Sequence, residues 1–169
     1  MSWIDKILPS IAIASKGVKK SAVPEGTWKK CPRCDAMLYT KSLSENYEVC
    51  PKCEHHLRIT ARRRIELFLD AGAQIELNVD MEPVDLLKFK DRKKYKDRIS
   101  AAQKSTGEKD ALIVVKGKVN DIPVIAAAFE FSFIGGSMGA VVGEKFTQAV
   151  NTCIEEKLPL VCFSTSGGA

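Results

Sequence analysis

Four cysteines in the first third of the chain constrain its fold more than any other feature. They form two C-x2-C pairs, Cys31 with Cys34 and Cys50 with Cys53, with fifteen residues between the pairs. Two residues between cysteines let both sulfurs turn toward one point, and two such knuckles can surround a tetrahedral zinc ion. Because four thiolates leave no open coordination position, the spacing predicts one structural Zn²⁺ and not a catalytic one.

The other uses of cysteine fit this sequence less well. Disulfides would need an oxidising compartment, and the first residues do not have the pattern of a secretory signal peptide. A redox C-x-x-C is expected beside a βαβ pattern, which does not occur around these cysteines. His55 and His56 could be spare ligands, but with four cysteines we expect them near the metal or on the surface. Cys153 and Cys162 lie in apolar surroundings and are predicted to be buried.

Composition is that of a globular protein, with 45% hydrophobic and 28% charged residues. No apolar run reaches eighteen residues, so we expect no membrane span. Free cysteines and the lack of a leader pattern predict a cytoplasmic protein. The net charge of +5 is uneven, since residues 1–64 hold thirteen Lys/Arg against six Asp/Glu and residues 65–169 hold thirteen against fifteen. A basic cysteine module suggests a polyanionic partner, either a nucleic acid or a phosphorylated ligand such as coenzyme A.

Three regions are predicted along the chain. Residues 1–24 carry a short apolar stripe and then a linker. Residues 25–60 form the zinc module, with strands expected at 27–30, 37–39 and 47–49. Residues 61–169 form an α/β region, in which Thr60 should cap a helix that runs to about Ala71, with Gly72 following it.

Two basic runs in the α/β region have alternative interpretations. Arg62, Arg63 and Arg64 could clamp a phosphate or form a solvated helix face. Residues 85–107 are predicted to contain a helix that Gly107 ends, and seven of the eleven residues from 88 to 98 are basic. That helix could be a charged surface element or an anion-binding one.

The last third has the pattern of a ββα unit. Residues 111–119 and 122–131 are predicted to form a hairpin with a turn at Asn120 and Asp121. A helix at about 141–156 follows, with apolar residues at helical spacing, and then a strand at 160–163 that should be buried on both faces. Because only one crossover unit is present, we expect this sequence to be the N-terminal piece of a longer protein.

Two glycine-rich turns flank this predicted helix and strand. One contains Gly135, Gly136, Ser137, Met138 and Gly139, and the other contains Gly167 and Gly168. Glycine lets backbone amides approach a ligand closely, so such turns can bind phosphate or stabilise an oxyanion, although each alone is also consistent with a tight turn. Neither a dinucleotide fingerprint nor a Walker motif is present, and no Ser/His/Asp arrangement can be assembled. Any catalysis is therefore expected to use backbone amides.

Taken together, these stretches resemble the beta subunit of the bacterial acetyl-CoA carboxylase carboxyltransferase. The resemblance rests on MSWI, PEGTWKKCPRC, EVCPKCEHHLRITARRRI, LKFKDRKKYKDRI, TGEKDALIV, AAFEFSFIGGSMG and FSTSGGA. It implies a four-cysteine zinc ribbon followed by the start of a crotonase-like domain, a spiral of ββα units. It also implies carboxyl transfer from carboxybiotin, held on a biotin carboxyl carrier protein, to acetyl-CoA, giving malonyl-CoA for fatty acid biosynthesis. The implied partners are an alpha subunit, in a tetramer of two alpha and two beta chains, and biotin carboxylase.

The resemblance also assigns roles to residues. Gly167 and Gly168 match an oxyanion-stabilising pair, and residues 135–139 match a substrate-binding stretch that lines the active-site region. The basic residues at 62–64 and 88–98 remain candidates for coenzyme A phosphates or for the alpha subunit. The competing interpretation is a ribbon that binds nucleic acid, with Trp28, Tyr39 and Tyr47 stacking on bases, unless Trp28 and Tyr39 form the core of the ribbon.

Overall fold

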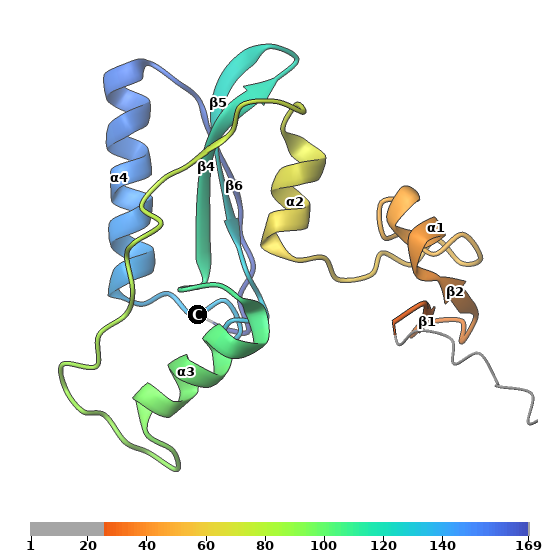
Figure 1. Cartoon of the computed structure of the whole chain (residues 1–169), viewed down its shortest axis with the longest axis horizontal. Coiled ribbons are helices and arrows are strands. Elements are labelled where there is room, and N and C mark those ends of the chain that lie inside the picture. Colours follow the sequence, from red (N-terminus) through yellow and green to blue (C-terminus); the bar gives the residue numbers. More distant parts are fainter. Residues whose placement is uncertain (1–25, 169) are drawn as a thin grey trace, which may run out of the picture.

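The computed structural model describes residues 26–168, which form a small N-terminal ribbon and an α/β body (Figure 1). The helix predicted within residues 1–24 lies outside the described residues. The ribbon contains β1 (Trp28–Lys30), β2 (Met37–Tyr39) and α1 (Thr40–Glu45). The body contains α2 (Ala61–Phe68), β3 (Ile75–Glu76), α3 (Tyr95–Thr106), β4 (Leu112–Val119), β5 (Ile122–Phe129), α4 (Ala140–Glu156) and β6 (Leu160–Phe163). None of these helices is long and apolar enough to cross a membrane.

One four-stranded sheet, in the order β3-β4-β5-β6, organises the body. β4 and β5 form the predicted antiparallel hairpin, with Val119 opposite Ile122 at its tip. Asn120 and Asp121 both have positive φ, which is the backbone shape of a two-residue turn that matches strand twist. β6 then pairs parallel with β5 after the α4 crossover. The predicted ββα unit is therefore present.

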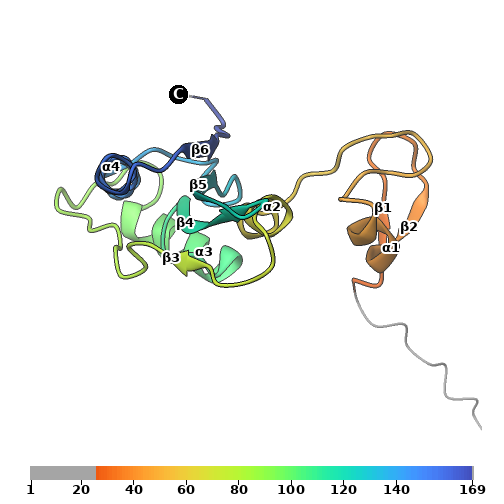
Figure 2. The same cartoon turned by 90° about the horizontal axis from the view of Figure 1, so that it is seen from above.

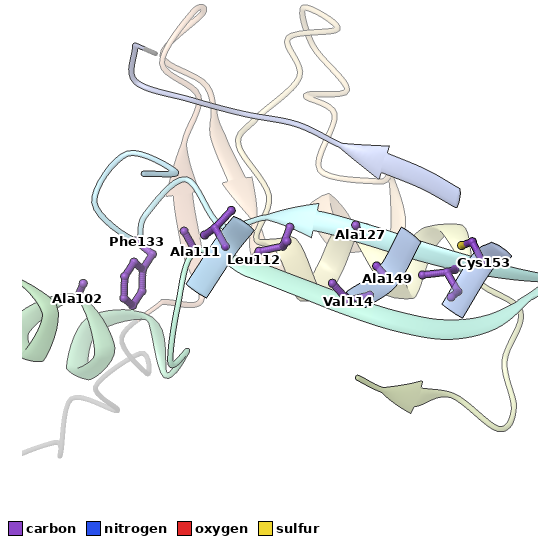
Figure 3. Close-up of a cluster of buried hydrophobic side chains, with 10 residues drawn as sticks. Ala102, Ala111, Leu112, Val114, Ala127, Phe133, Ala149 and Cys153 are labelled. Carbon is purple, nitrogen blue, oxygen red and sulfur yellow. The ribbon is translucent and has the colours of Figure 1, made fainter. Parts of the chain in front are cut away.

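Both faces of this sheet are covered, which explains why β4 and β5 read as nearly continuous apolar runs. Leu112 and Val114 belong to the core beneath α4, together with Ala149 and Cys153 of that helix (Figure 3). Ile113 and Val115 point to the other face, where they pack with Ile65 and Leu69. Figure 2 shows α2 and α4 on opposite sides of the sheet.

The end of α2 differs from the prediction because of the hairpin that it covers. Thr60 caps the helix as expected, accepting a hydrogen bond from the Arg63 amide at 3.2 Å. The helix ends at Phe68 and not near Ala71, because Leu69 adopts an extended backbone. Its side chain lies over Gly117, where an added Cβ would come within 2.8 Å of it. The next residue, Asp70, accepts hydrogen bonds from the amides of the hairpin turn.

Three further predictions need correction. Residues 47–49 do not form a strand, because Tyr47 and Glu48 have positive φ and only Val49 makes an isolated bridge, to His56. β6 is only partly buried, since in residues 26–168 it lies at the edge of the sheet. Cys162, on this strand, is consequently exposed, whereas Cys153 is buried as predicted. The helix predicted in residues 85–107 is confirmed as α3 and ends at Gly107, but residues 84–94 form a loop before it.

Candidate metal centre and glycine-lined pocket

The two cysteine knuckles repeat one backbone pattern. In the first, the Cys31 amide donates to the Ala36 carbonyl and the Asp35 amide donates back to the Cys31 carbonyl, at 2.9 and 3.0 Å. In the second, Cys50 and His55 make the first of these bonds and Glu54 makes the second, each at 2.9 Å. Asp35 and Glu54 both have φ of 58°. Each knuckle is therefore a tight turn that closes on its own first cysteine.

The four sulfurs meet at one point between the knuckles. The Sγ atoms of Cys31 and Cys53 are 3.6 Å apart, and those of Cys34 and Cys50 are 3.8 Å apart. All four lie within 4.8 Å of one another. Four sulfurs at about 2.3 Å from a tetrahedral zinc ion would be separated by about 3.8 Å. The donor set and its geometry fit Zn²⁺, and neither His55 nor His56 belongs to the group.

The close packing of four cysteine sulfurs favours the binding of a cation between them. Burial raises the pKa of the Cys53 thiol to about 12, and the neighbouring thiols act in the same direction. Burial also disfavours the Cys31 thiolate, but the backbone amides of Cys34 and Arg33 outweigh it and lower the Cys31 pKa to about 6. A divalent cation at the centre would stabilise all four thiolates, and its binding would add to the folding free energy of a unit with a small core. That core consists of Cys31, Leu38, Leu43 and Cys50.

The aromatic residues of the ribbon lie outside this core. Trp28 and Tyr39 are 52% and 43% exposed and contact one another with ring centroids 5.5 Å apart. Tyr47 is also exposed. The alternative that Trp28 and Tyr39 form the core of the ribbon is therefore wrong.

The two glycine-rich turns, which are about thirty residues apart in the sequence, lie side by side in the structure. The Gly167 amide donates a hydrogen bond to the Gly135 carbonyl at 2.7 Å. An added Cβ at Gly136 would come within 2.4 Å of the Thr165 carbonyl oxygen. Gly135, Gly136 and Gly168 all have positive φ, a conformation that glycine adopts at least cost. Both predicted turns therefore require glycine for backbone shape and for close approach.

Together the turns line a cavity of about 460 Å³. Its walls come from Ile134, Gly135, Ser137, Met138, Ser166, Gly167 and Gly168. Gly139 lies apart from this lining and is the N-cap of α4, with no side chain capping the helix. The uncapped amides of the first turn of α4 give this region a positive field. The arrangement can accommodate an oxygen that carries partial negative charge.

The amides of Gly167 and Gly168 already have partners within the chain. Gly167 donates to Gly135, as above, and the Gly168 amide donates to the Ser166 hydroxyl at 3.1 Å. The second bond is longer and exposed, so a ligand oxygen could replace the Ser166 hydroxyl as the acceptor. Of the two amides, Gly168 is the one more readily available to a ligand.

The three consecutive arginines of α2 do not form a phosphate clamp. Arg62 binds the carboxylates of Glu108 and Glu76, at 2.6 and 2.9 Å, and these bonds raise its pKa further. Arg63 donates to the Ser44 carbonyl at 3.1 Å. The Arg64 guanidinium lies 5.5 Å from the centre of the Phe163 ring. Each side chain therefore faces a different part of the protein.

Sequence reasoning missed the buried polar groups of the body. Lys145, within α4, is only 5% exposed and donates to the Leu112 carbonyl at 3.1 Å, which fixes the helix to the start of β4. Burial lowers the Lys145 pKa and raises that of the nearby Asp110 carboxyl. Lys145 occupies a position on the apolar side of α4, and that break in the pattern was the available signal.

Glu130 is the second missed residue, and it links α2 to the turn before the glycines. Its carboxylate accepts hydrogen bonds from the amides of Ala61 and Ser132, both at 2.9 Å. The signal in the sequence was an acidic residue that interrupts the apolar run from 122 to 134. Just before α2, the Arg58 guanidinium lies 3.8 Å from the centre of the Phe131 ring. Together these contacts hold the segment that follows the ribbon against the residues that lead to Gly135.

Comparison with known proteins bears on both parts of the chain. Residues 28–53 match the acetyl-CoA carboxylase zinc finger domain. Among solved structures, transcarboxylase 12S, crystallised with methylmalonyl-coenzyme A and methylmalonic acid, has a TM-score of 0.51 and 23% identity over 66% of this chain. A single-chain, multi-domain long-chain acyl-CoA carboxylase has a TM-score of 0.53 and 18% identity over 76% of this chain. The beta subunit of geranyl-CoA carboxylase from P. aeruginosa has a TM-score of 0.50 and 23% identity over 76% of this chain.

At these identities the structural matches establish a shared fold. The matched regions are 20%, 12% and 21% of the three known chains, so this chain corresponds to a minor part of each. The resemblance to a carboxyltransferase beta subunit is confirmed at two levels, the type of zinc ribbon and the fold of the body. This chain therefore joins an acetyl-CoA carboxylase-type zinc ribbon to part of the crotonase-like fold found in transcarboxylase and acyl-CoA carboxylase chains.

Proposed function

We propose that this chain is part of the beta subunit of a carboxyltransferase that forms malonyl-CoA from acetyl-CoA, in the cytoplasm, for fatty acid biosynthesis. The observation that carries the proposal is the contact between the two glycine turns, with the Gly167 amide 2.7 Å from the Gly135 carbonyl. It creates a cavity edged by backbone amides on a chain whose ribbon matches that of acetyl-CoA carboxylase. The zinc ion in this proposal is structural.

The proposed chemistry needs no nucleophile from the protein. Carboxybiotin supplies CO₂ and, as the ureido anion left behind, a base for the acetyl methyl group, so that the thioester enolate can take up the CO₂. Both this enolate and the ureido oxygen carry negative charge, which amide donors and a helix N-terminus stabilise. The Gly168 amide would donate to one such oxygen in place of the Ser166 hydroxyl, while Gly135, Ser137 and Met138 would line the substrate cavity.

The proposed partners follow from the reaction. An alpha subunit would complete the carboxyltransferase as a tetramer of two alpha and two beta chains, biotin carboxylase would load biotin, and the carrier protein would deliver it. Transcarboxylase 12S, with its fold similar to this one, is described as a hexameric multienzyme core, which supports a multisubunit arrangement. The nucleic-acid alternative is not favoured, because the ribbon matches a carboxylase domain.

The test uses the full-length chain co-purified with its alpha subunit. We expect malonyl-CoA formation from acetyl-CoA that depends on carboxybiotinylated carrier protein, measured by liquid chromatography. Propionyl-CoA and a longer acyl-CoA serve as competing substrates, because the solved relatives act on different acyl groups. A complex that carboxylates a longer acyl-CoA in preference to acetyl-CoA would contradict the proposed substrate.

A further inference from the structure

The loop between β3 and α3 exposes large apolar side chains to an unusual degree. We call residues 84–94 the basic–apolar loop. Its apolar members are Val84, Leu86, Leu87 and Phe89, which are 71%, 85%, 88% and 56% exposed. Single exposed apolar residues are normal on a protein surface, but several within six positions mark an interaction site. In Figure 1 this yellow-green segment extends beyond the sheet, on the side where α4 begins.

Hydrogen bonds within the loop hold these side chains outward. The Phe89 amide donates to the Asp85 carboxylate at 3.0 Å, and the Tyr95 amide donates to the Phe89 carbonyl at 2.9 Å. Asp91 accepts from the Lys93 amide at 2.9 Å and from Arg98 at 2.6 Å. The backbone is therefore pre-organised around its acidic residues, which lowers the entropic cost of binding a partner.

The basic–apolar loop has a net positive charge that is free to interact with a partner. Its two carboxylates are engaged as described, and the pKa of Asp91 is held below its usual range by the Lys93 amide and then by Arg98. Its cations are all exposed, and within residues 26–168 none of them forms an ion pair: they are Lys88, Lys90, Arg92, Lys93 and Lys94. Apolar side chains surrounded by unpaired cations complement an acidic surface that has apolar residues at its centre.

The loop borders the proposed catalytic region. Val84 and Tyr95 line a cavity of about 70 Å³ together with Ser137 and Gly139. An added Cβ at Gly139 would be 4.0 Å from the Tyr95 hydroxyl. A partner seated on the basic–apolar loop would therefore lie next to the glycine-rich turn and the start of α4.

We propose that the basic–apolar loop is the docking surface for an acidic carrier protein that delivers the carboxyl group to the glycine-lined pocket. This inference rests on the proposed function, because that reaction requires a carried substrate. A carrier must bind and leave in each turnover, and a small surface rich in unpaired charge suits such a transient partner. A permanent subunit interface is typically larger and more apolar.

The test compares carrier-linked biotin with free biotin in the full-length complex with its alpha subunit. In the reverse direction, malonyl-CoA gives its carboxyl group to either form of biotin and leaves acetyl-CoA, which is measured in both cases. We expect the double variants Leu86→Ser/Leu87→Ser and Lys88→Glu/Lys90→Glu each to raise KM for the biotinylated carrier at least about tenfold. Kinetics with free biotin should not change, because free biotin does not need the docking surface.

Matched controls carry the same types of change elsewhere on the surface. Ile154→Ser removes an exposed apolar side chain of α4, and Lys41→Glu reverses an exposed charge in α1 of the ribbon. Neither should alter KM for the carrier. Equal losses with carrier-linked and free biotin in the loop variants would overturn the proposal, because the loop would then act on the pocket or on folding. Unchanged kinetics in the loop variants would also overturn it.

Binding of the biotinylated carrier domain, measured by fluorescence anisotropy, separates this proposal from the proposed function. Suppose that the wild-type complex binds the carrier but transfers no carboxyl group, and that the loop variants do not bind the carrier. The docking surface is then supported and the proposed reaction is contradicted. A wild-type complex that does not bind the carrier overturns the docking surface. The docking surface is also overturned if the loop variants fail to assemble with the alpha subunit. It is likewise overturned if the variants still bind the carrier and lose only binding to phosphatidylserine vesicles.

Discussion

The amide of Gly167 donates a 2.7 Å hydrogen bond to the carbonyl oxygen of Gly135. This bond joins the end of the segment after β6 to the segment between β5 and α4. Since β5 and β6 are parallel neighbours, the turns that follow them leave the same edge of the sheet. The bond therefore brings two glycine-rich turns that are separate in the sequence together at one pocket.

The close approach of the two turns can be tested at Gly136. Replacing Gly136 with Ala would place a Cβ within 2.4 Å of the Thr165 carbonyl, at a φ of +72°. We expect the free energy of unfolding to fall by more than about 2 kcal/mol, from strain and from displacement of the Thr165 segment. The measurement is urea denaturation. Gly139→Ala is the control, because its φ is −93° and its nearest contact would be 4.0 Å away; equal destabilisation by both would contradict the model of contacting turns.

The role of the Gly168 amide predicts a catalytic defect in the full-length complex. Gly168→Val would put a branched side chain beside the cavity at a φ of +137°. Loss of one oxyanion donor typically lowers kcat by about 10²–10³-fold, and we expect a loss in that range with a smaller change in KM for acetyl-CoA. Gly72→Val is the matched control, because Gly72 also has positive φ and open space around it but lies outside the pocket. It should leave kcat unchanged. A folded Gly168→Val complex with normal kcat would exclude this amide as the donor.

Zinc binding should account for the folding of the ribbon. We expect one zinc ion per chain in protein purified under reducing conditions, and none in Cys31→Ser or Cys50→Ser, which also lose the ribbon fold. Inductively coupled plasma mass spectrometry measures the zinc content, and two-dimensional proton–nitrogen NMR spectra report the fold of the ribbon. Cys162→Ser, at an exposed cysteine outside the four-cysteine group, should retain its zinc. Full zinc content in Cys31→Ser would show that the four sulfurs are not the ligands.

Asp70 should make stability depend on acid pH. The amides of Asp121 and Asn120 lower its pKa by donating to the carboxylate, at 2.9 and 3.0 Å. Because the folded pKa lies below the unfolded value of about 3.9, its stabilisation is present above that value and is lost as pH falls through the folded pKa. We expect Asp70→Ala to lower Tm by a few degrees at pH 7 and the difference from wild type to shrink toward pH 2. A difference that stayed constant with pH would rule out the carboxylate as the source.

Glu130 should stabilise the junction between α2 and the turn before the glycines. Glu130→Ala leaves the buried Ala61 amide and the partly buried Ser132 amide without their acceptor, so we expect a loss of about 2–3 kcal/mol in unfolding free energy. Glu130→Gln keeps one acceptor oxygen and should lose less. Differential scanning calorimetry measures both, and zinc content should not change in either. An Ala variant as stable as wild type would mean that water replaces the carboxylate.

Elements with local causes could be predicted from the amino-acid sequence alone. The cysteine spacing predicted a zinc module because each knuckle closes through hydrogen bonds within a few residues. The hairpin turn at Asn120 and Asp121, the Thr60 cap and the Gly107 helix end were predicted for the same reason, and all are present. Apolar periodicity predicted β4, β5 and α4 to within two residues at each end.

Properties that depend on contacts between distant segments could not be predicted in this way. The early end of α2 follows from the packing of Leu69 over Gly117, and the exposure of Cys162 follows from the edge position of β6. The three arginines look alike in sequence, but their partners lie 14 to 46 residues away for Arg62 and 19 residues away for the Ser44 contact of Arg63. The outward side chains of the basic–apolar loop could not be read from their apolar character. Local patterns fix backbone shape, whereas burial and pairing depend on which segments the fold brings together.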